Sequence, residues 1–206
     1  MLENVKLVSI IREVETPHAL KIIEALYEEG IHHFEVSLSD EKMGLECIQA
    51  AQEAFADLDL KVGAGTVSKK SQIDQLSSWK TPYILTPGFD EAIVDYALSK
   101  GIEVLPGVLT PTDVQKAANH GLKLLKLFPA DAFGSSYIKA LKGPFPGIDY
   151  VAVGGVTAQN AGEFIKNGFA GVAAGSNLVP KRATEKDIEV IRKTAREYRE
   201  AVFKGV

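Results

Sequence analysis

The sequence predicts an α/β protein in which residues 1–206 form a single (β/α)8 TIM barrel. Short apolar runs alternate with amphipathic stretches along the whole chain. Eight such pairs can be counted, and strands that strictly alternate with helices form parallel sheets. No linker, low-complexity tract or abrupt change of composition divides the sequence. Eight repeats favour a closed, eight-stranded parallel barrel over the alternative, an open doubly wound sheet of the flavodoxin or Rossmann type.

The composition is that of a soluble globular domain with a substantial core, since 46% of the residues are hydrophobic and 24% are charged. The net charge is −4, and lysines and arginines are scattered among acidic residues. Because no basic stripe results, we expect neither nucleic acid nor a membrane as a partner. The N-terminal apolar run is too short to span a membrane and lacks a cleavage site, which predicts a cytoplasmic protein.

Cysteine and histidine usage gives no sign of disulfides or metals. Cys47 is the only cysteine, so no intrachain disulfide can form. The four histidines show no spacing suited to metal ligands. We therefore expect neither a metal nor another cofactor.

The eight expected strands are short apolar runs, each followed by a stretch that can form a helix. They are residues 7–11, 33–38, 60–65, 83–88, 103–108, 122–128, 150–155 and 170–175.

Helix starts and ends are marked by residues that satisfy unpaired backbone groups. Three residues precede a proline or glutamate in N-cap arrangements, namely Thr16, Asp90 and Thr110. Thr184 is expected to open the final helix. Four glycines occupy positions typical of left-handed helix C-caps, namely Gly30, Gly101, Gly121 and Gly168.

The stretch LKLLKLFPAD, residues 122–131, places two lysines in one expected strand. Counting five residues from the glycines that end three helices reaches Glu35, Pro106 and Lys126, so these residues should lie at similar heights near the top of the barrel. Because side chains alternate along a strand, Lys123 and Lys126 must point in opposite directions. We predict that Lys126 faces the lumen and that Lys123 faces the helices or solvent.

Lys126 and Glu35 meet the usual requirement for barrel enzymes, whose chemistry lies at the C-terminal ends of the strands. Burial lowers the pKa of a lysine and makes a neutral, nucleophilic amine available, which suits Schiff-base chemistry. The alternative is a structural ion pair between Lys126 and Glu35, since such pairs also perturb pKa values.

Several motifs resemble those of one enzyme family. KLFPAD, residues 126–131, is similar to the lysine signature of the 2-keto-3-deoxy-6-phosphogluconate (KDPG) and 4-hydroxy-2-oxoglutarate (KHG) aldolases, class I enzymes of the Entner-Doudoroff and related sugar-acid pathways. FEVSL, GAGTV, LTPGF, LPGVLTP, KGPFPG, VGGV and GSNLVP follow the order of the family's motifs and cover nearly the whole chain. The resemblance implies that Lys126 forms the imine and that Glu35 is the acid/base.

The resemblance also implies roles for residues around this pair. Phe128 and Pro87 match residues that shape a pyruvate pocket, and Thr66 matches a threonine beside the pyruvyl carboxylate. Taken alone, Phe128 could be core, whereas Pro87 and Thr66 could merely end strands.

Four small residues match the family's phosphate site, where backbone N–H groups approach an anion at a helix N-terminus. They are Gly154, Gly155, Gly175 and Ser176. Without the resemblance, such glycines would be read as tight turns.

Two departures from the family pattern leave the substrate open. Many gluconate-type members have an arginine where this chain has Ser39 and a threonine where it has Val153. Three features are more similar to members that cleave the galactonate epimer, namely the VGGV motif, residues 132–142 and Arg12. The GSNLVP motif is instead similar to the gluconate-type members. Arg12 is expected to bind a carboxylate or phosphate, unless it is a surface arginine at the start of a loop.

The main expectation is cleavage of KDPG to pyruvate and glyceraldehyde 3-phosphate, with the galactonate epimer (KDPGal) or KHG as alternative main substrates. The family also implies a homotrimer. Two other readings are another phosphate-binding barrel, such as a ribulose-phosphate epimerase or thiamine-phosphate synthase, and a non-catalytic barrel that binds a sugar phosphate. Neither of these needs Lys126 and Glu35 together.

Overall fold

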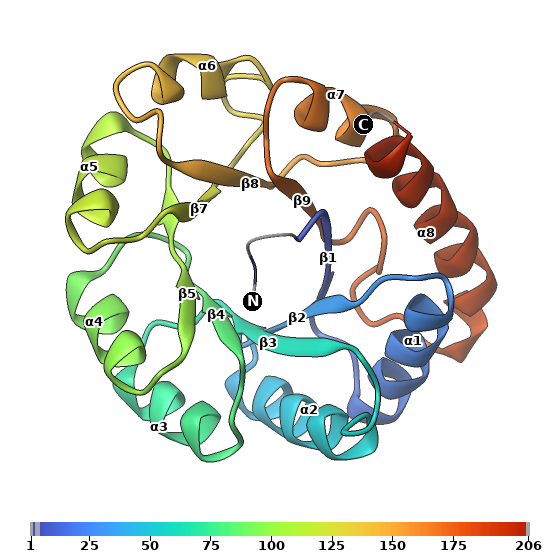
Figure 1. Cartoon of the computed structure of the whole chain (residues 1–206). Coiled ribbons are helices and arrows are strands. Elements are labelled where there is room, and N and C mark those ends of the chain that lie inside the picture. The colour runs from blue at the N-terminus through green and yellow to red at the C-terminus, as the bar shows by residue number, and fades with distance from the viewer. Residues whose placement is uncertain (1, 3–4, 205–206) are drawn as a thin grey trace.

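The computed structural model describes residues 2 and 5–204, which form a ring of parallel strands surrounded by helices (Figure 1). The strands are β1 (Leu7–Ile11), β2 (His33–Ser37), β3 (Lys61–Gly65), β4 (Tyr83–Leu85), β5 (Glu103–Leu105), β6 (Gly107–Val108), β7 (Leu124–Leu127), β8 (Asp149–Val153) and β9 (Gly171–Ala174). The helices are α1 (Thr16–Glu28), α2 (Glu41–Ala54), α3 (Lys70–Ser78), α4 (Glu91–Ser99), α5 (Pro111–Asn119), α6 (Tyr137–Lys142), α7 (Ala158–Lys166) and α8 (Ile188–Phe203).

The sheet order is β5-β4-β3-β2-β1-β9-β8-β7-β6, so the two edge strands are consecutive in the chain. The expected fifth strand is divided at Pro106, which has no N–H with which to continue the ladder. The Pro106 carbonyl still accepts a hydrogen bond from Lys126 N at 3.0 Å. The predicted count of eight strands is therefore corrected to nine in the described chain. The predicted α/β fold with a nearly closed parallel barrel is confirmed.

The predicted helix boundaries hold with one exception. Asp90 and Thr110 accept hydrogen bonds from backbone N–H groups three residues later. Thr184 caps the short 3-10 helix Glu185–Asp187, which leads directly into α8. Thr16 is wrong as an N-cap, because it is the first helical residue and the extended Glu15 precedes it without a side-chain cap. The four predicted C-cap glycines all have positive φ, between +75° and +102°.

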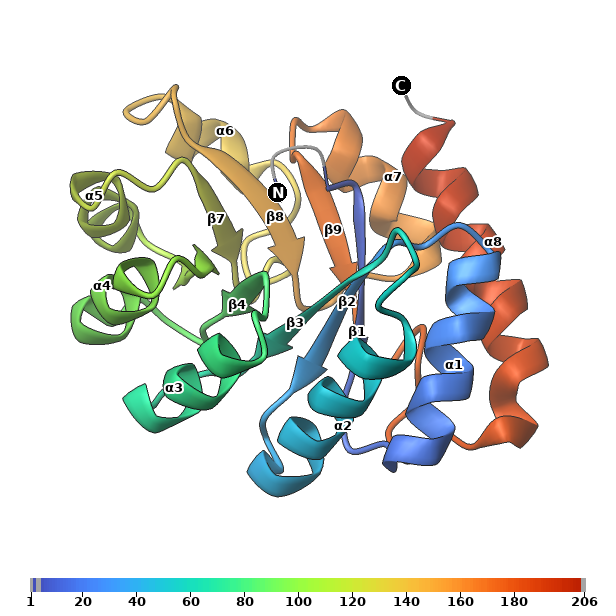
Figure 2. The same ribbon diagram turned by 60° about the horizontal axis from the view of Figure 1, so that its bottom comes forward.

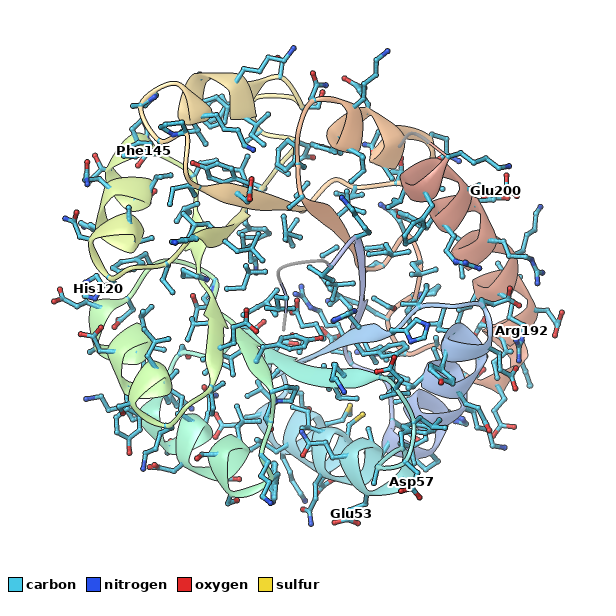
Figure 3. All side chains as sticks on the ribbon, in the orientation of Figure 1. Glu53, Asp57, His120, Phe145, Arg192 and Glu200 are labelled. Atoms are coloured by element: carbon cyan, nitrogen blue, oxygen red, sulfur yellow. The ribbon has the colours of Figure 1, made fainter. Side chains whose placement is uncertain are left out.

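Apolar side chains fill two separate layers, and polar groups lie mainly outside. One layer packs between the strands and the helices. The other lies inside the barrel, where Leu2 and Val5 pack with lumen-facing residues such as Tyr83 and Val151. Figure 3 shows side chains filling the lumen, while the labelled Arg192 and Glu200 lie on the outer ring of helices.

The strands run in one direction, so their C-terminal ends gather at one rim of the barrel (Figure 2). The strands themselves carry Glu35, Lys126 and Val153, and the loops that follow the strands at this rim carry the other predicted site residues. No helix in the described part of the chain is long and apolar enough to cross a membrane.

Candidate active site

Lys126 is the third residue of β7, and its side chain is only 6% exposed. Its strand neighbours Leu125 and Leu127 belong to the layer under the helices, so alternation turns Lys126 into the lumen. Lys123, three positions earlier, is exposed. The predicted opposite orientation of the two lysines is confirmed, and Lys126 is the only buried lysine among the described residues.

Glu35 lies in the lumen on β2, where it is 1% exposed. Parallel pairing sets it opposite Ile10 of β1 and Gly63 of β3. Gly65 makes room for its carboxylate, because a Cβ at Gly65 would lie 1.7 Å from Glu35 Oε1. Among the described residues, Glu35 Oε2 has no hydrogen-bond partner. The carboxylate therefore has an unused acceptor atom inside the barrel.

Burial dominates the protonation of both groups. It raises the pKa of Glu35, against the opposing attraction of Lys126 and Arg12. It lowers the pKa of Lys126, and the Arg12 cation adds to this effect while Glu35 opposes it. The two groups interact only through space, without a direct hydrogen bond. The geometry therefore does not support the structural ion pair, which needs direct contact to offset the cost of burial.

Phe128 and Arg12 lie beside the lysine. Lys126 Nζ is 4.7 Å from the centroid of the Phe128 ring, within the range of a cation–π contact. Phe128 is 39% exposed and is therefore not a core residue. Arg12 follows β1 and is half-buried, and its Nε has no hydrogen-bond partner among the described residues. A guanidinium with a free, buried N–H is suited to bind an anion.

A cavity of about 240 Å³ opens at this rim between the ends of β1, β8 and β9. Seven predicted site residues line it, namely Arg12, Phe128, Val153, Gly154, Gly155, Gly175 and Ser176. Gly154 and Gly155 have φ of +93° and +68°, which side chains rarely adopt. A Cβ at Gly155 would lie 2.2 Å from the Asp131 side chain, so this turn requires a glycine.

The helix after this turn adds to the anion-binding character of the cavity. Thr157 caps α7 by accepting from Asn160 N, so the backbone donors of the helix start lie next to the Gly154–Gly155 turn. Asn177 also lines the cavity, and its Nδ2 donates to Val156 O at 3.0 Å, which ties the loop after β9 to the loop after β8. Small residues and backbone N–H groups of this kind can hold a phosphate.

Thr66 and Pro87 follow β3 and β4 at the same rim but do not line this cavity. Thr66 has a left-handed backbone with φ of +62°, and its hydroxyl lies 3.0 Å from Ser37 Oγ. Pro87 is exposed and lies in a loop held by a 2.7 Å hydrogen bond from the Thr86 hydroxyl to Gly88 O. Both therefore stand at strand ends, on the opposite side of the lumen from β8 and β9.

Sequence reasoning did not single out Gly65, Ser37 or Asn177. The signal for Ser37 was available, because it has the same strand parity as Glu35 two residues earlier. No cluster of three His, Cys, Asp or Glu residues suited to a metal occurs in the described chain. The expected absence of a metal stays a prediction.

A larger cavity of about 380 Å³ lies on the rim and is lined by Glu13, His18, Ser39 and Arg182, among others. Neither cavity is lined by Lys126 or Glu35. The smaller cavity is the better candidate site, because seven predicted site residues line it, among them Phe128, whose ring centroid lies 4.7 Å from Lys126 Nζ.

Comparison with known proteins gives a consistent picture. The family model for KDPG and KHG aldolases matches residues 1–194. The 2-dehydro-3-deoxy-6-phosphogalactonate aldolase of Escherichia coli K12 is 35% identical over 198 residues, which cover 95% of this chain and 96% of the relative. The KHG/KDPG aldolase of the same organism is 30% identical and covers 92% and 88%. A solved structure described as native KDPGal is 32% identical, with a TM-score of 0.87 over 98% of this chain and 96% of that chain.

Proposed function

The chain belongs to the KDPG and KHG aldolase family and is therefore an aldolase, a carbon–carbon lyase; we propose that it cleaves KDPG to pyruvate and glyceraldehyde 3-phosphate through a Schiff base on Lys126. The observation that carries this proposal is the buried Lys126, whose pKa is lowered and which shares the lumen with Glu35. Other phosphate-binding barrels and sugar-phosphate sensors need no such pair.

Lys126 acts as the nucleophile in this mechanism. Its neutral amine attacks the C2 ketone of the substrate, and the resulting carbinolamine loses water to give an iminium. Desolvation favours this step because it lowers the pKa of the lysine and increases the share of neutral amine. The iminium then accepts the electron pair of the C3–C4 bond.

Glu35 moves the protons. Through a water molecule, its carboxylate takes the proton of the C4 hydroxyl as the C3–C4 bond breaks, and the aldehyde departs. The enamine that remains takes a proton at C3, and water then hydrolyses the iminium to release pyruvate and free Lys126. The raised pKa of Glu35 suits a group that must both accept and return a proton.

The remaining site residues bind the two charged ends of the substrate. We assign the phosphate to the 240 Å³ cavity at Gly154, Gly155, Gly175 and Ser176. We assign the pyruvyl carboxylate to Thr66, with Pro87 and Phe128 shaping the pocket. Arg12 lines this cavity and has an unpartnered, buried Nε, and we assign it to bind either the phosphate or the carboxylate.

KDPGal is the second candidate for the main substrate. It is favoured by Val153, which lines the cavity where many gluconate-type members have threonine, and by the name of the 35% identical relative. KHG, which carries no phosphate, is the third candidate. The glycine-rich cavity favours the two phosphorylated acids.

The test is a cleavage assay on KDPG, KDPGal and KHG that follows pyruvate release. Cleavage of the phosphorylated acids, unaffected by EDTA, is expected. A preference for KHG would contradict the phosphate assignment. Borohydride with pyruvate should leave a reduced adduct on Lys126, and an adduct on Lys123 instead would contradict the Schiff-base mechanism.

We also propose a homotrimer that works in the cytoplasm. Phe133 is 60% exposed and packs against Tyr137 in a tilted arrangement, with ring centroids 4.8 Å apart, so an apolar surface is available for contact between subunits. Sedimentation equilibrium would measure the mass of the assembly, and a monomer at micromolar concentration would contradict the trimer.

A further inference from the structure

Thr66 points in a direction that strand alternation does not explain. Along β3, Gly63 and Gly65 face the lumen, since a Cβ on them would meet Tyr83 and Glu35 respectively. Thr66 should therefore face outward. Its φ of +62°, rare for a β-branched residue, instead brings its hydroxyl to the lumen-facing Ser37.

Ser37 is placed to hold this hydroxyl. It ends β2 opposite Gly65, shares the face of Glu35 and is only 3% exposed. Its Oγ lies 3.0 Å from Thr66 Oγ1. It accepts from Ser39 N at 3.3 Å and can donate to Ser39 Oγ at 3.3 Å. Two acceptors therefore compete for the single proton of Ser37.

We propose that Ser37 is a positioning residue that sets the direction in which the Thr66 hydroxyl donates, and thereby selects a carboxylate on the bound keto acid. This inference rests on the proposed function, which places the pyruvyl carboxylate beside Thr66.

The argument follows from the proton count of a hydroxyl, which has one donor and two acceptor lone pairs. When Ser37 donates to Ser39, the Thr66 proton points at Ser37, and Thr66 presents only lone pairs to the site. When Ser37 donates to Thr66, the Thr66 proton is free for the substrate. A carboxylate stabilises the second arrangement, whereas an ester stabilises it far less because it carries no charge.

Borohydride trapping with pyruvate and with methyl pyruvate separates this role from a structural one. Both compounds can form an imine with Lys126 at the same ketone carbon, but only pyruvate carries a free carboxylate. In Ser37→Ala, the pyruvate concentration for half-maximal trapping should rise about tenfold, and that for methyl pyruvate less than about twofold. Ser37→Thr keeps the hydroxyl and should restore the preference for pyruvate.

Ser9→Ala is the matched control. Ser9 is an equally buried serine on the neighbouring strand β1, but its Oγ has no hydrogen-bond partner among the described residues. Its removal should leave both trapping curves unchanged.

A double-mutant cycle completes the test. Once Thr66→Val has removed the hydroxyl that Ser37 orients, Ser37→Ala should add no further loss of pyruvate preference. If the wild type forms no adduct with pyruvate, the proposed function fails, and this inference fails with it. If the wild type forms the adduct but Ser37→Ala keeps the full preference for pyruvate, only the role of Ser37 is overturned.

Discussion

The lower and upper halves of the barrel lumen are lined by the same strands but filled in opposite ways. In the lower half, Leu2, Val5 and Tyr83 pack together, and the Tyr83 hydroxyl is satisfied by Phe34 O at 2.8 Å. In the upper half, Lys126 and Glu35 are also buried, yet Glu35 Oε2 has no hydrogen-bond partner among the described residues. Burial therefore stabilises the fold in the lower half, whereas in the upper half it shifts the pKa values of Lys126 and Glu35 and makes them reactive.

The contrast is visible within the single strand β3. A Cβ at Gly63 would lie 2.2 Å from the Tyr83 ring, and a Cβ at Gly65 would lie 1.7 Å from the Glu35 carboxylate. Gly63 leaves room for the large Tyr83 side chain, which fills the lower lumen. Gly65 leaves room for the Glu35 carboxylate, which faces the site. A tightly packed lower half can hold the strands in place while the upper half keeps unsatisfied ionisable groups, which are otherwise costly.

Replacing Lys126 should have the largest effect. Lys126→Met removes the nucleophile, so we expect cleavage to fall by about 10³-fold or more. Stability should change in the opposite direction. Because the folded-state pKa of Lys126 is lowered, the unfolded chain binds the proton more readily at neutral pH, and charged Lys126 opposes folding. Urea unfolding at pH 7 should show a gain of about 1 kcal/mol.

The sign of this effect can be checked with pH. The gain should shrink as pH rises through the unfolded-state pKa of lysine, where both states carry a neutral amine. Lys123→Met, at an exposed position of the same segment, should change neither activity nor stability. Full activity in Lys126→Met would contradict the claim that the upper half of the lumen holds the reactive groups.

The two glycines of β3 provide the next test. Gly65→Ala should displace the Glu35 carboxylate, the mobile end of a side chain, and lower kcat by about 10²-fold with little loss of stability. Gly63→Ala should displace the Tyr83 ring and lower the free energy of unfolding by about 3 kcal/mol, while the folded fraction stays active. If both variants lost activity and stability together, the lower half of the lumen could not be assigned to stability and the upper half to activity.

Glu35→Gln tests the role of the upper half with a smaller structural change, because it keeps the shape of the Glu35 side chain and removes only its basic carboxylate. Exchange of the pyruvate methyl protons with deuterated water should slow by about 10²-fold. Loss of the negative charge also removes the interaction that raises the Lys126 pKa, so that pKa should fall further. Borohydride trapping of pyruvate should then extend to lower pH. Unchanged exchange would show that another group carries the proton.

The regular spacing of the apolar runs predicted the barrel and the burial of Lys126 and Glu35 inside it. Helix-ending glycines fix where each strand begins, and alternation then fixes which side chains face the lumen. The sequence also contains a signal for the break at Pro106, since proline interrupts a ladder, although the continuous apolar run at 103–108 favours a single strand. The sequence does not fix the position of Thr16, because proline at 17 fits either of the first two helical positions.

The inner contacts of the site were not predictable in the same way. Thr66 follows a strand whose parity turns it outward, and only its left-handed backbone brings it to Ser37. The role of Gly65 depends on a carboxylate from another strand, which local sequence does not reveal. The resemblance to a family supplied the remaining residues of the cavity, and the structure shows that they gather in one place.

The smallest expected effect concerns Val153, at the end of β8, where the apolar lumen meets the cavity. Threonine there can hydrogen-bond a substrate hydroxyl or phosphate, whereas valine leaves a facing polar group unpaired at a cost of about 1 to 3 kcal/mol. We therefore expect both phosphorylated epimers to be cleaved with kcat/KM values within about 10²-fold, and Val153→Thr to shift the ratio toward KDPG by about tenfold. Val151→Thr adds the same hydroxyl two residues lower and should reduce stability without moving the ratio. An unchanged ratio in Val153→Thr would exclude this position from substrate choice.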